Sequence, residues 1–129
     1  MRIEWKGKYR IGEPVIDAQH REWFAKVNRF LEADGKEALK RCEAEMYAYT
    51  HEHFKHEEFV MRSVHYPDIA NHIRLHDALV ERLHEISRQI ENDTLDRAMW
   101  ESFLGDWLLN HIRLVDSKLA TYIHKYASC

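Results

Sequence analysis

The chain is poor in residues that interrupt helices and in those that cross-link small folds. Its 129 residues include four glycines and two prolines, so few positions force a turn and long helices are favoured. The only cysteines are Cys42 and Cys129, which are too far apart for a CxxC metal or redox motif. Two isolated thiols exclude a disulfide-rich scaffold and predict reduced cysteines in a cytoplasmic protein.

Long apolar runs and a bias toward one charge are also absent. The longest apolar runs have three or four residues, far fewer than a membrane-spanning helix needs. Residues 1–6 lack the apolar core of a signal peptide. The formal net charge of −3 is spread along the chain, so no basic face predicts a nucleic-acid partner. We therefore expect one domain over residues 1–129, with no membrane insertion and no nucleic-acid binding.

Apolar residues recur every three or four positions, and this period predicts an all-α protein. An irregular N-terminal arm is expected over residues 1–16 and a helical bundle over residues 17–126, with Asp17 as the N-cap of the first helix. Turn-forming residues divide the bundle into four helices at Asp34-Gly35, at residues 65–68 and at Asn92-Asp93. Short connections favour antiparallel neighbours, so the sequence predicts an up-down-up-down four-helix bundle.

Polar side chains stand where the helices should present apolar residues to a core. They are His20, His53, Glu57, His72, His76, His111 and Asp116. One buried histidine or acid would be a routine core residue with a hydrogen-bonding partner. So many without partners would be costly, and a bound cation removes that cost. We therefore interpret the set as ligands to metal.

The spacing of these residues supports a shared site. His53 and Glu57 are four residues apart, as are His72 and His76, so each pair lies on one face of its helix. His111 and Asp116 are five residues apart, or about 140° apart on a regular helix. If both bind, the helix must be irregular over residues 111–116. In the predicted topology all of these positions fall at one end of the bundle.

The ligand set favours two ions over one. Seven ligands without cysteine are too many for a tetrahedral zinc ion. Five imidazoles and two carboxylates suit two octahedral ions that share the carboxylates, with a solvent-derived oxide or hydroxide as third bridge. An ion with three histidines is then full, whereas an ion with two keeps one position open for a small molecule such as dioxygen. Ferritin-like sites need two Glu-x-x-His motifs, and only Glu81/His84 fits that pattern here.

Five segments in chain order carry a family resemblance. They are Ile16-Asp17-Ala18-Gln19-His20, His53-Phe54-x-x-Glu57-Glu58, Tyr66-Pro67, His72-x-x-x-His76 and Trp107-x-x-x-His111-x-x-x-x-Asp116. Over almost its whole length the chain resembles single-domain hemerythrins of the bacterial type. The resemblance implies two iron ions (Fe2+/Fe3+) with an oxo or hydroxo bridge, and reversible binding of dioxygen.

The resemblance also assigns roles to individual residues. It implies that His72, His76 and His111 hold the filled iron, that His20 and His53 hold the open iron, and that Glu57 and Asp116 bridge them. Gln19 and Glu58 are expected to support ligands from a second layer. The expected oxygen pocket consists of residues next to a ligand or one turn away, of which Trp23 is bulky for its position: Trp23, Phe54, Trp107, Leu108 and Ile112.

The expected function is binding rather than turnover, because an apolar pocket with no spare acid or base gives little help to further chemistry. We expect a cytoplasmic monomer that carries or stores dioxygen, or senses it, with an oxygen-consuming enzyme as a further partner. Two alternatives stay open at this stage. One is a di-iron oxidase, peroxidase or ferroxidase, and the other is a protein that handles nitric oxide or iron.

Overall fold

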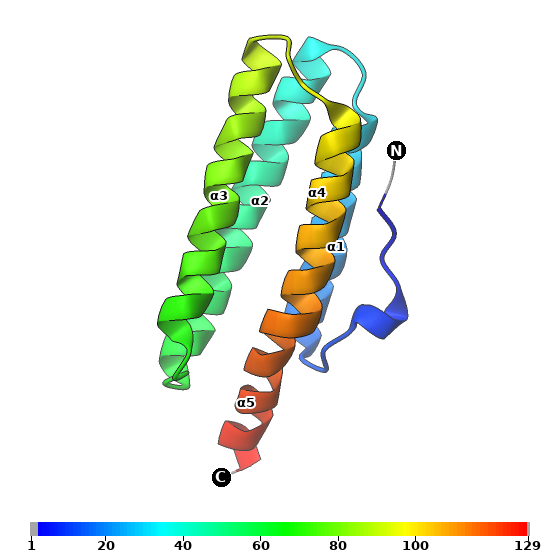
Figure 1. Cartoon of the computed structure of the whole chain (residues 1–129). Helices are drawn as coiled ribbons and strands as arrows, with labels where there is room; N and C mark the ends of the chain where they lie inside the picture. Colours follow the sequence, from blue (N-terminus) through cyan, green and yellow to red (C-terminus); the bar gives the residue numbers. More distant parts are fainter. Residues whose placement is uncertain (1–2, 129) are drawn as a thin grey trace.

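The structure, a computed structural model, describes residues 3–128 and contains helices but no strand within that range. Its elements are η1 (Gly7–Tyr9), α1 (Pro14–Glu32), α2 (Lys36–Ser63), α3 (Ile69–Glu91), α4 (Arg97–Asn110), η2 (His111–Asp116) and α5 (Ser117–Ser128). The segment η2 is π-helical and joins α4 to α5 in one continuous rod. Four rods lie side by side with short turns between them (Figure 1), which confirms the predicted all-α four-helix bundle.

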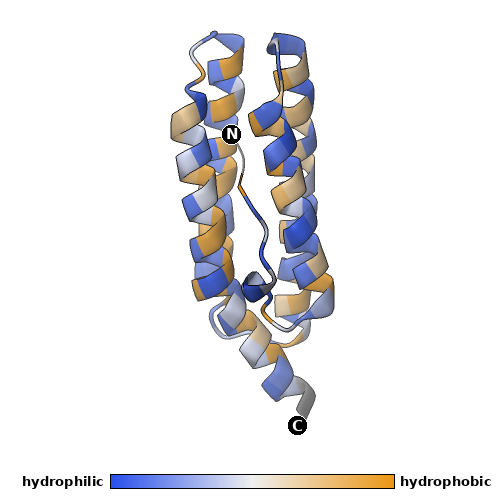
Figure 2. Cartoon of the chain, turned by 90° about the vertical axis from the view of Figure 1, so that its right-hand side faces the viewer, coloured by the Kyte–Doolittle hydropathy of each residue, from blue (hydrophilic) through white to orange (hydrophobic). Residues whose placement is uncertain are grey.

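The order of the helices brings distant segments to the same end of the bundle. The start of α1, the α2–α3 turn and the junction of α4 with α5 lie together at the lower end of Figure 1. The N-terminal arm runs along the outside of the rods (Figure 2). It is anchored by Asn28, whose side chain accepts a hydrogen bond from the Ile3 amide and donates one to the Ile3 carbonyl, both at 2.7 Å.

The first helix begins one turn earlier than predicted. Pro14 occupies its first position, where a fixed φ favours helix and no amide is needed. The Glu13 carboxylate accepts the Ile16 amide at 2.7 Å and is the N-cap. The prediction that Asp17 caps this helix is therefore wrong. Its carboxylate instead accepts the amides of Ile11 and Gly12, at 2.7 and 3.1 Å, and holds the end of the arm.

The predicted breaks between helices are confirmed. Gly35 separates α1 from α2. Its φ of +89° is a backbone conformation that favours glycine. The α2–α3 turn contains His65 at φ 52°, and the α3–α4 turn contains Asp93 at φ 58°. These three residues with positive φ lie in the turns that join consecutive antiparallel helices.

Apolar side chains form two separate clusters. The larger fills most of the bundle and includes Phe30, Leu83, Ile86, Trp100 and Leu104. The smaller, which we call the end cluster, consists of Ile16, Met61, Tyr66 and Leu119. On each rod the polar residues singled out by the sequence lie where these two clusters meet. A polar layer is therefore enclosed by apolar packing above and below.

Two sequence expectations concern the environment of the whole chain. No helix among residues 3–128 is both long enough and apolar enough to cross a membrane. Cys42 is buried and forms no disulfide within the described residues. Cys129 lies outside the described residues.

Candidate metal centre

Seven buried polar side chains meet in this layer, contributed by every rod of the bundle. His20 comes from α1, His53 and Glu57 from α2, His72 and His76 from α3, and His111 and Asp116 from η2. None is more than 4% exposed, and both carboxylates are 0% exposed. Of the remaining histidines, His51, His65, His84 and His124 are exposed and His56 is half-buried. Among the described histidines, burial is thus confined to the predicted ligands.

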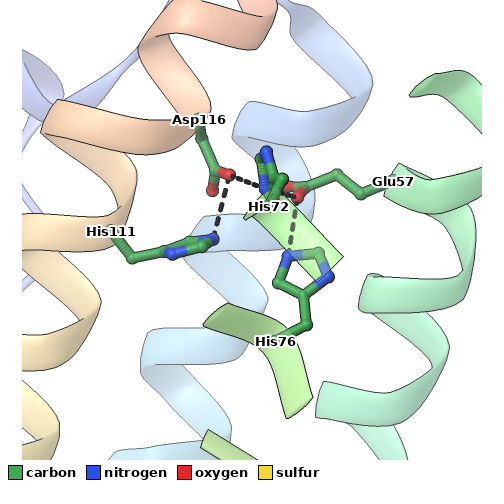
Figure 3. Close-up of side chains that lie close together, drawn as sticks. All are labelled: Glu57, His72, His76, His111 and Asp116. Atoms are coloured by element: carbon green, nitrogen blue, oxygen red, sulfur yellow. Dashed lines mark hydrogen bonds and ion pairs between the residues drawn. The ribbon is translucent and has the colours of Figure 1, made fainter. Parts of the chain in front are cut away.

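The seven residues form two groups that share both carboxylates. In the first group, one ligand atom each of His72, His76 and His111 lies within 4.8 Å of the others and of an oxygen of Glu57 and of Asp116. In the second group, one nitrogen each of His20 and His53 lies within the same distance of each other and of the same two acids. Figure 3 shows the carboxylates and imidazoles of the first group converging from three rods. The arrangement has the unequal division, three imidazoles against two, that the sequence predicted.

Each carboxylate directs one oxygen to each group. Glu57 Oε1 lies 2.9 Å from His72 Nε2 and 3.1 Å from His76 Nε2, whereas its Oε2 lies 3.2 Å from His53 Nε2. Asp116 Oδ1 lies 3.0 Å from His72 Nε2 and 3.1 Å from His111 Nε2. Its other oxygen, Oδ2, lies 2.9 Å from His20 Nε2. Both acids are therefore oriented as bridges.

The π-helical segment η2 explains how His111 and Asp116 reach the same layer. A π-helix takes one more residue into each hydrogen-bonded turn than an α-helix does. Residues five apart, which diverge on a regular helix, then project to one side. The predicted irregularity over residues 111–116 is confirmed, and it coincides with the bounds of η2.

Several of these atoms are buried without a hydrogen-bond partner. They are His20 Nε2, His53 Nε2, Glu57 Oε2, His111 Nε2 and both oxygens of Asp116. They lie 2.9 to 3.2 Å from oxygens or nitrogens of the acids and imidazoles in the same group. Despite these short distances they form no hydrogen bonds. Adjacent octahedral ligands with bonds of about 2.1 Å lie about 3.0 Å apart. The donor set therefore fits two bridged metal ions.

Without metal, two of the imidazoles in this layer bind protons strongly. Burial by itself lowers the pKa of His20, but the neighbouring Asp116 and Glu57 carboxylates outweigh burial and raise it to about 9. The pKa of His72 is raised to about 9 by the same balance. Burial favours protonated Glu57 and Asp116, yet their histidine partners hold both carboxyl pKa values well below the usual range. The metal-free layer thus places imidazolium at His20 and His72 beside ionised Glu57 and Asp116.

Metal uptake at pH 7 is expected to release roughly two protons per chain, because His20 and His72 must lose theirs to bind. The affinity for Fe2+ should then rise between pH 6 and pH 8 and level off near pH 9. Anaerobic titration of metal-free protein with Fe2+ in weakly buffered solution, followed with a pH indicator, measures both effects. Uptake of two ions with no proton release would contradict this account.

A second layer of side chains orients two of the imidazoles. Gln19 Oε1 lies 2.7 Å from His53 Nδ1, and Glu58 Oε2 lies 3.2 Å from His76 Nδ1. An acceptor on Nδ1 fixes the proton there and leaves Nε2 free for a metal. The two groups differ in this respect, since a neutral amide supports the group of two histidines and a carboxylate supports the group of three.

The residues expected to line the oxygen pocket surround the centre. Leu108 and Ile112 are buried, and Trp107 is half-buried with its ring stacked on His111 at 4.5 Å. Phe54 stacks on His76 at 3.6 Å, and Trp23 lies 5.0 Å from the His53 ring. Their role in ligand binding stays a prediction. Thr50, which accepts the indole N–H of Trp23 at 2.8 Å, was missed. The only sequence signal was a small polar residue on the inward face, one turn before His53 and Phe54.

Comparison with known proteins places this centre in a family. The model of the Hemerythrin HHE cation binding domain matches residues 12–123. The chain belongs to the hemerythrin family. The matched range includes all seven residues of the polar layer.

Hemerythrins from bacteria and animals resemble the chain over most of its length. A bacteriohemerythrin of Stenotrophomonas maltophilia (strain R551-3) is 32% identical over 126 residues, which covers 94% of this chain and 81% of the relative. Hemerythrin subunit 2 of Golfingia vulgaris is 27% identical over 114 residues, 88% of this chain and 87% of the relative. A solved wild-type hemerythrin superposes with a TM-score of 0.83 at 25% identity, over 92% of this chain and 95% of that one.

Proposed function

We propose that this member of the hemerythrin family binds dioxygen reversibly at a carboxylate-bridged pair of iron ions. His72, His76 and His111 would hold one ion, His20 and His53 the other, and Glu57 and Asp116 would bridge them. When bound and reduced, such a pair supplies two electrons to dioxygen and recovers them on release. The observation that carries the proposal is the division of five imidazoles into three and two around shared acids, since it leaves one ion short of a protein ligand.

The surrounding side chains favour binding over turnover. Trp23, Phe54, Leu108 and Ile112 are buried and apolar, so they exclude water from the layer. Glu58, the acid adjacent in sequence to Glu57, is engaged with His76 Nδ1 and is not available to deliver a proton. Cleavage of a bound oxygen molecule needs such a proton donor, and the engagement of Glu58 with His76 supports a carrier or store over an enzyme.

Reversible colour change on exposure to oxygen tests the proposal. Protein loaded with two iron ions, reduced and kept anaerobic, is expected to gain a visible absorption band when oxygen is admitted. The band should disappear on purging with inert gas and return on a second exposure. A band that never reverses, or repeated consumption of oxygen well beyond one molecule per iron pair, would favour the oxidase or peroxidase alternative. A larger spectral response to nitric oxide than to oxygen would favour a protein that handles nitric oxide or iron.

We further infer that residues 1–129 act as a single unit that carries or stores oxygen in the cytoplasm as a monomer. The two cysteines, Cys42 and Cys129, are far apart in the sequence and form no CxxC motif, and this sparse usage supports a reducing compartment. An oxygen-consuming enzyme is the partner that such a store would supply. Size-exclusion chromatography of the iron-loaded protein with light scattering tests the monomer, and a dimer would contradict it.

A further inference from the structure

Aromatic rings are distributed unevenly around the polar layer. The Phe54 ring stacks on the His76 imidazole, its nearest, with 3.6 Å between ring centroids and 5° between planes. The Trp107 ring stacks on His111, with 4.5 Å between centroids and 11° between planes. Both rings therefore cover the group of three histidines. Trp23 faces the other group, since its ring lies 5.0 Å from that of His53 and 6.3 Å from that of His20, with 30° between the Trp23 and His20 planes.

The position of Trp23 is fixed by packing and by a hydrogen bond. Its side chain is 1% exposed, with Phe54 at 5.4 Å and Trp107 at 6.1 Å against its edges. The indole N–H donates to Thr50 Oγ1 at 2.8 Å, and the Thr50 hydroxyl donates to the Met46 carbonyl at 2.8 Å. The ring cannot turn without breaking a buried hydrogen bond.

We propose that Trp23 is a specificity-determining residue that limits the ligand of the His20/His53 ion to diatomic size. This inference rests on the proposed function, which puts the open position on that ion. A fixed indole beside both imidazoles leaves little space, because protein interiors hold few voids larger than a water molecule. Its only polar hydrogen is already donated to Thr50, so the wall offers an anion no hydrogen bond. The site then favours small neutral molecules and disfavours longer ions.

Two monoanions of different length separate size from charge. In the oxidised, iron-loaded protein, cyanide has two atoms and azide has three, and both change the visible spectrum when they bind iron. Trp23→Leu is expected to speed azide association about tenfold, because a lost indole opens a cavity beside the ion. Cyanide association should change by less than about threefold, since it already fits. Stopped-flow absorption gives both rates, and equal acceleration of the two anions would overturn the proposal.

Two further variants guard against a general loss of structure. Trp100 is a buried tryptophan in the first turn of α4, at the far end of the bundle, and Trp100→Leu removes the same volume without changing the azide rate. Thr50→Val keeps Trp23 and removes only the acceptor of its N–H. It should shift the ultraviolet resonance Raman band that reports indole hydrogen bonding and speed azide about threefold. An unshifted band together with an unchanged azide rate would also overturn the proposal.

Failure of this inference differs from failure of the proposed function. The anion rates need two bound iron ions but no oxygen. If the unmodified protein shows no reversible oxygen band, the proposed function fails whatever the azide rates are. If the oxygen band reverses and Trp23→Leu leaves the ratio of azide to cyanide rates unchanged, only the role of Trp23 is wrong.

Discussion

Glu57→Gln is expected to lower bound iron to about one ion per chain or less and to abolish the oxygen-dependent absorption. Glu57 is completely buried, and its two oxygens contact imidazoles of both groups. An amide nitrogen cannot ligate in place of the second oxygen, so the bridge is lost. In the metal-free protein the change also removes a charge that balances buried imidazolium, and breaking such a pair costs about 3–5 kcal/mol.

Iron analysis after gel filtration and chemical denaturation measure the two effects. Glu52→Gln is a matched control, because Glu52 is an exposed acid of the same helix and undergoes the same chemical change. It should retain two ions and full stability. A Glu57→Gln protein with two ions and reversible oxygen binding would show that Glu57 is not a bridge.

Removal of both metal ions should lower the Tm by about 15 °C or more. An ion present at a thousand times its Kd contributes about 4 kcal/mol, and each kcal/mol moves the Tm of a domain of this size by about 4 °C. The buried atoms without hydrogen-bond partners, such as both oxygens of Asp116, are the groups that lose their partner on chelation. Circular dichroism of loaded and chelated protein gives the difference.

The difference should widen as the pH rises. In the metal-free protein the raised pKa values of His20 and His72 contribute stability that is complete below about 6.5 and is lost as the pH passes through about 9. Over the same range metal binds more tightly, because fewer protons compete. Readdition of Fe2+ should restore the Tm, and the Glu57→Gln protein should show a much smaller response to chelation. Equal Tm values with and without metal would remove the structural role of the ions.

Much of the fold follows from the sequence because turn-forming residues are so few. Gly35 and Asp93 stand at turns that the sequence marked, and the three- and four-residue period between them has one interpretation. The meeting of His53, Glu57 and the other polar residues in one layer also follows, since an up-down topology fixes which helix ends adjoin. Their assignment as ligands stays a prediction, which the two experiments above address.

Other details depend on competition that a pattern does not resolve. Asp17 and Glu13 are both acceptable N-caps, and Pro14 decided between them because its ring suits only the first helical position. A five-residue spacing between His111 and Asp116 required an irregular helix but did not specify a π-helix. The bond from Trp23 to Thr50 joins α1 to α2, and such a pair depends on how far each helix is rotated about its axis.

The polar layer between the two apolar clusters also bears on how the rods find their alignment. Rods that meet only through apolar side chains can slide past each other by one turn and still bury similar surface. Here a slide of four residues would press Asp116 or Glu57 against the end cluster or the larger cluster, with no partner for its charge. Misaligned bundles are therefore penalised, and the centre selects a single vertical register for all four rods.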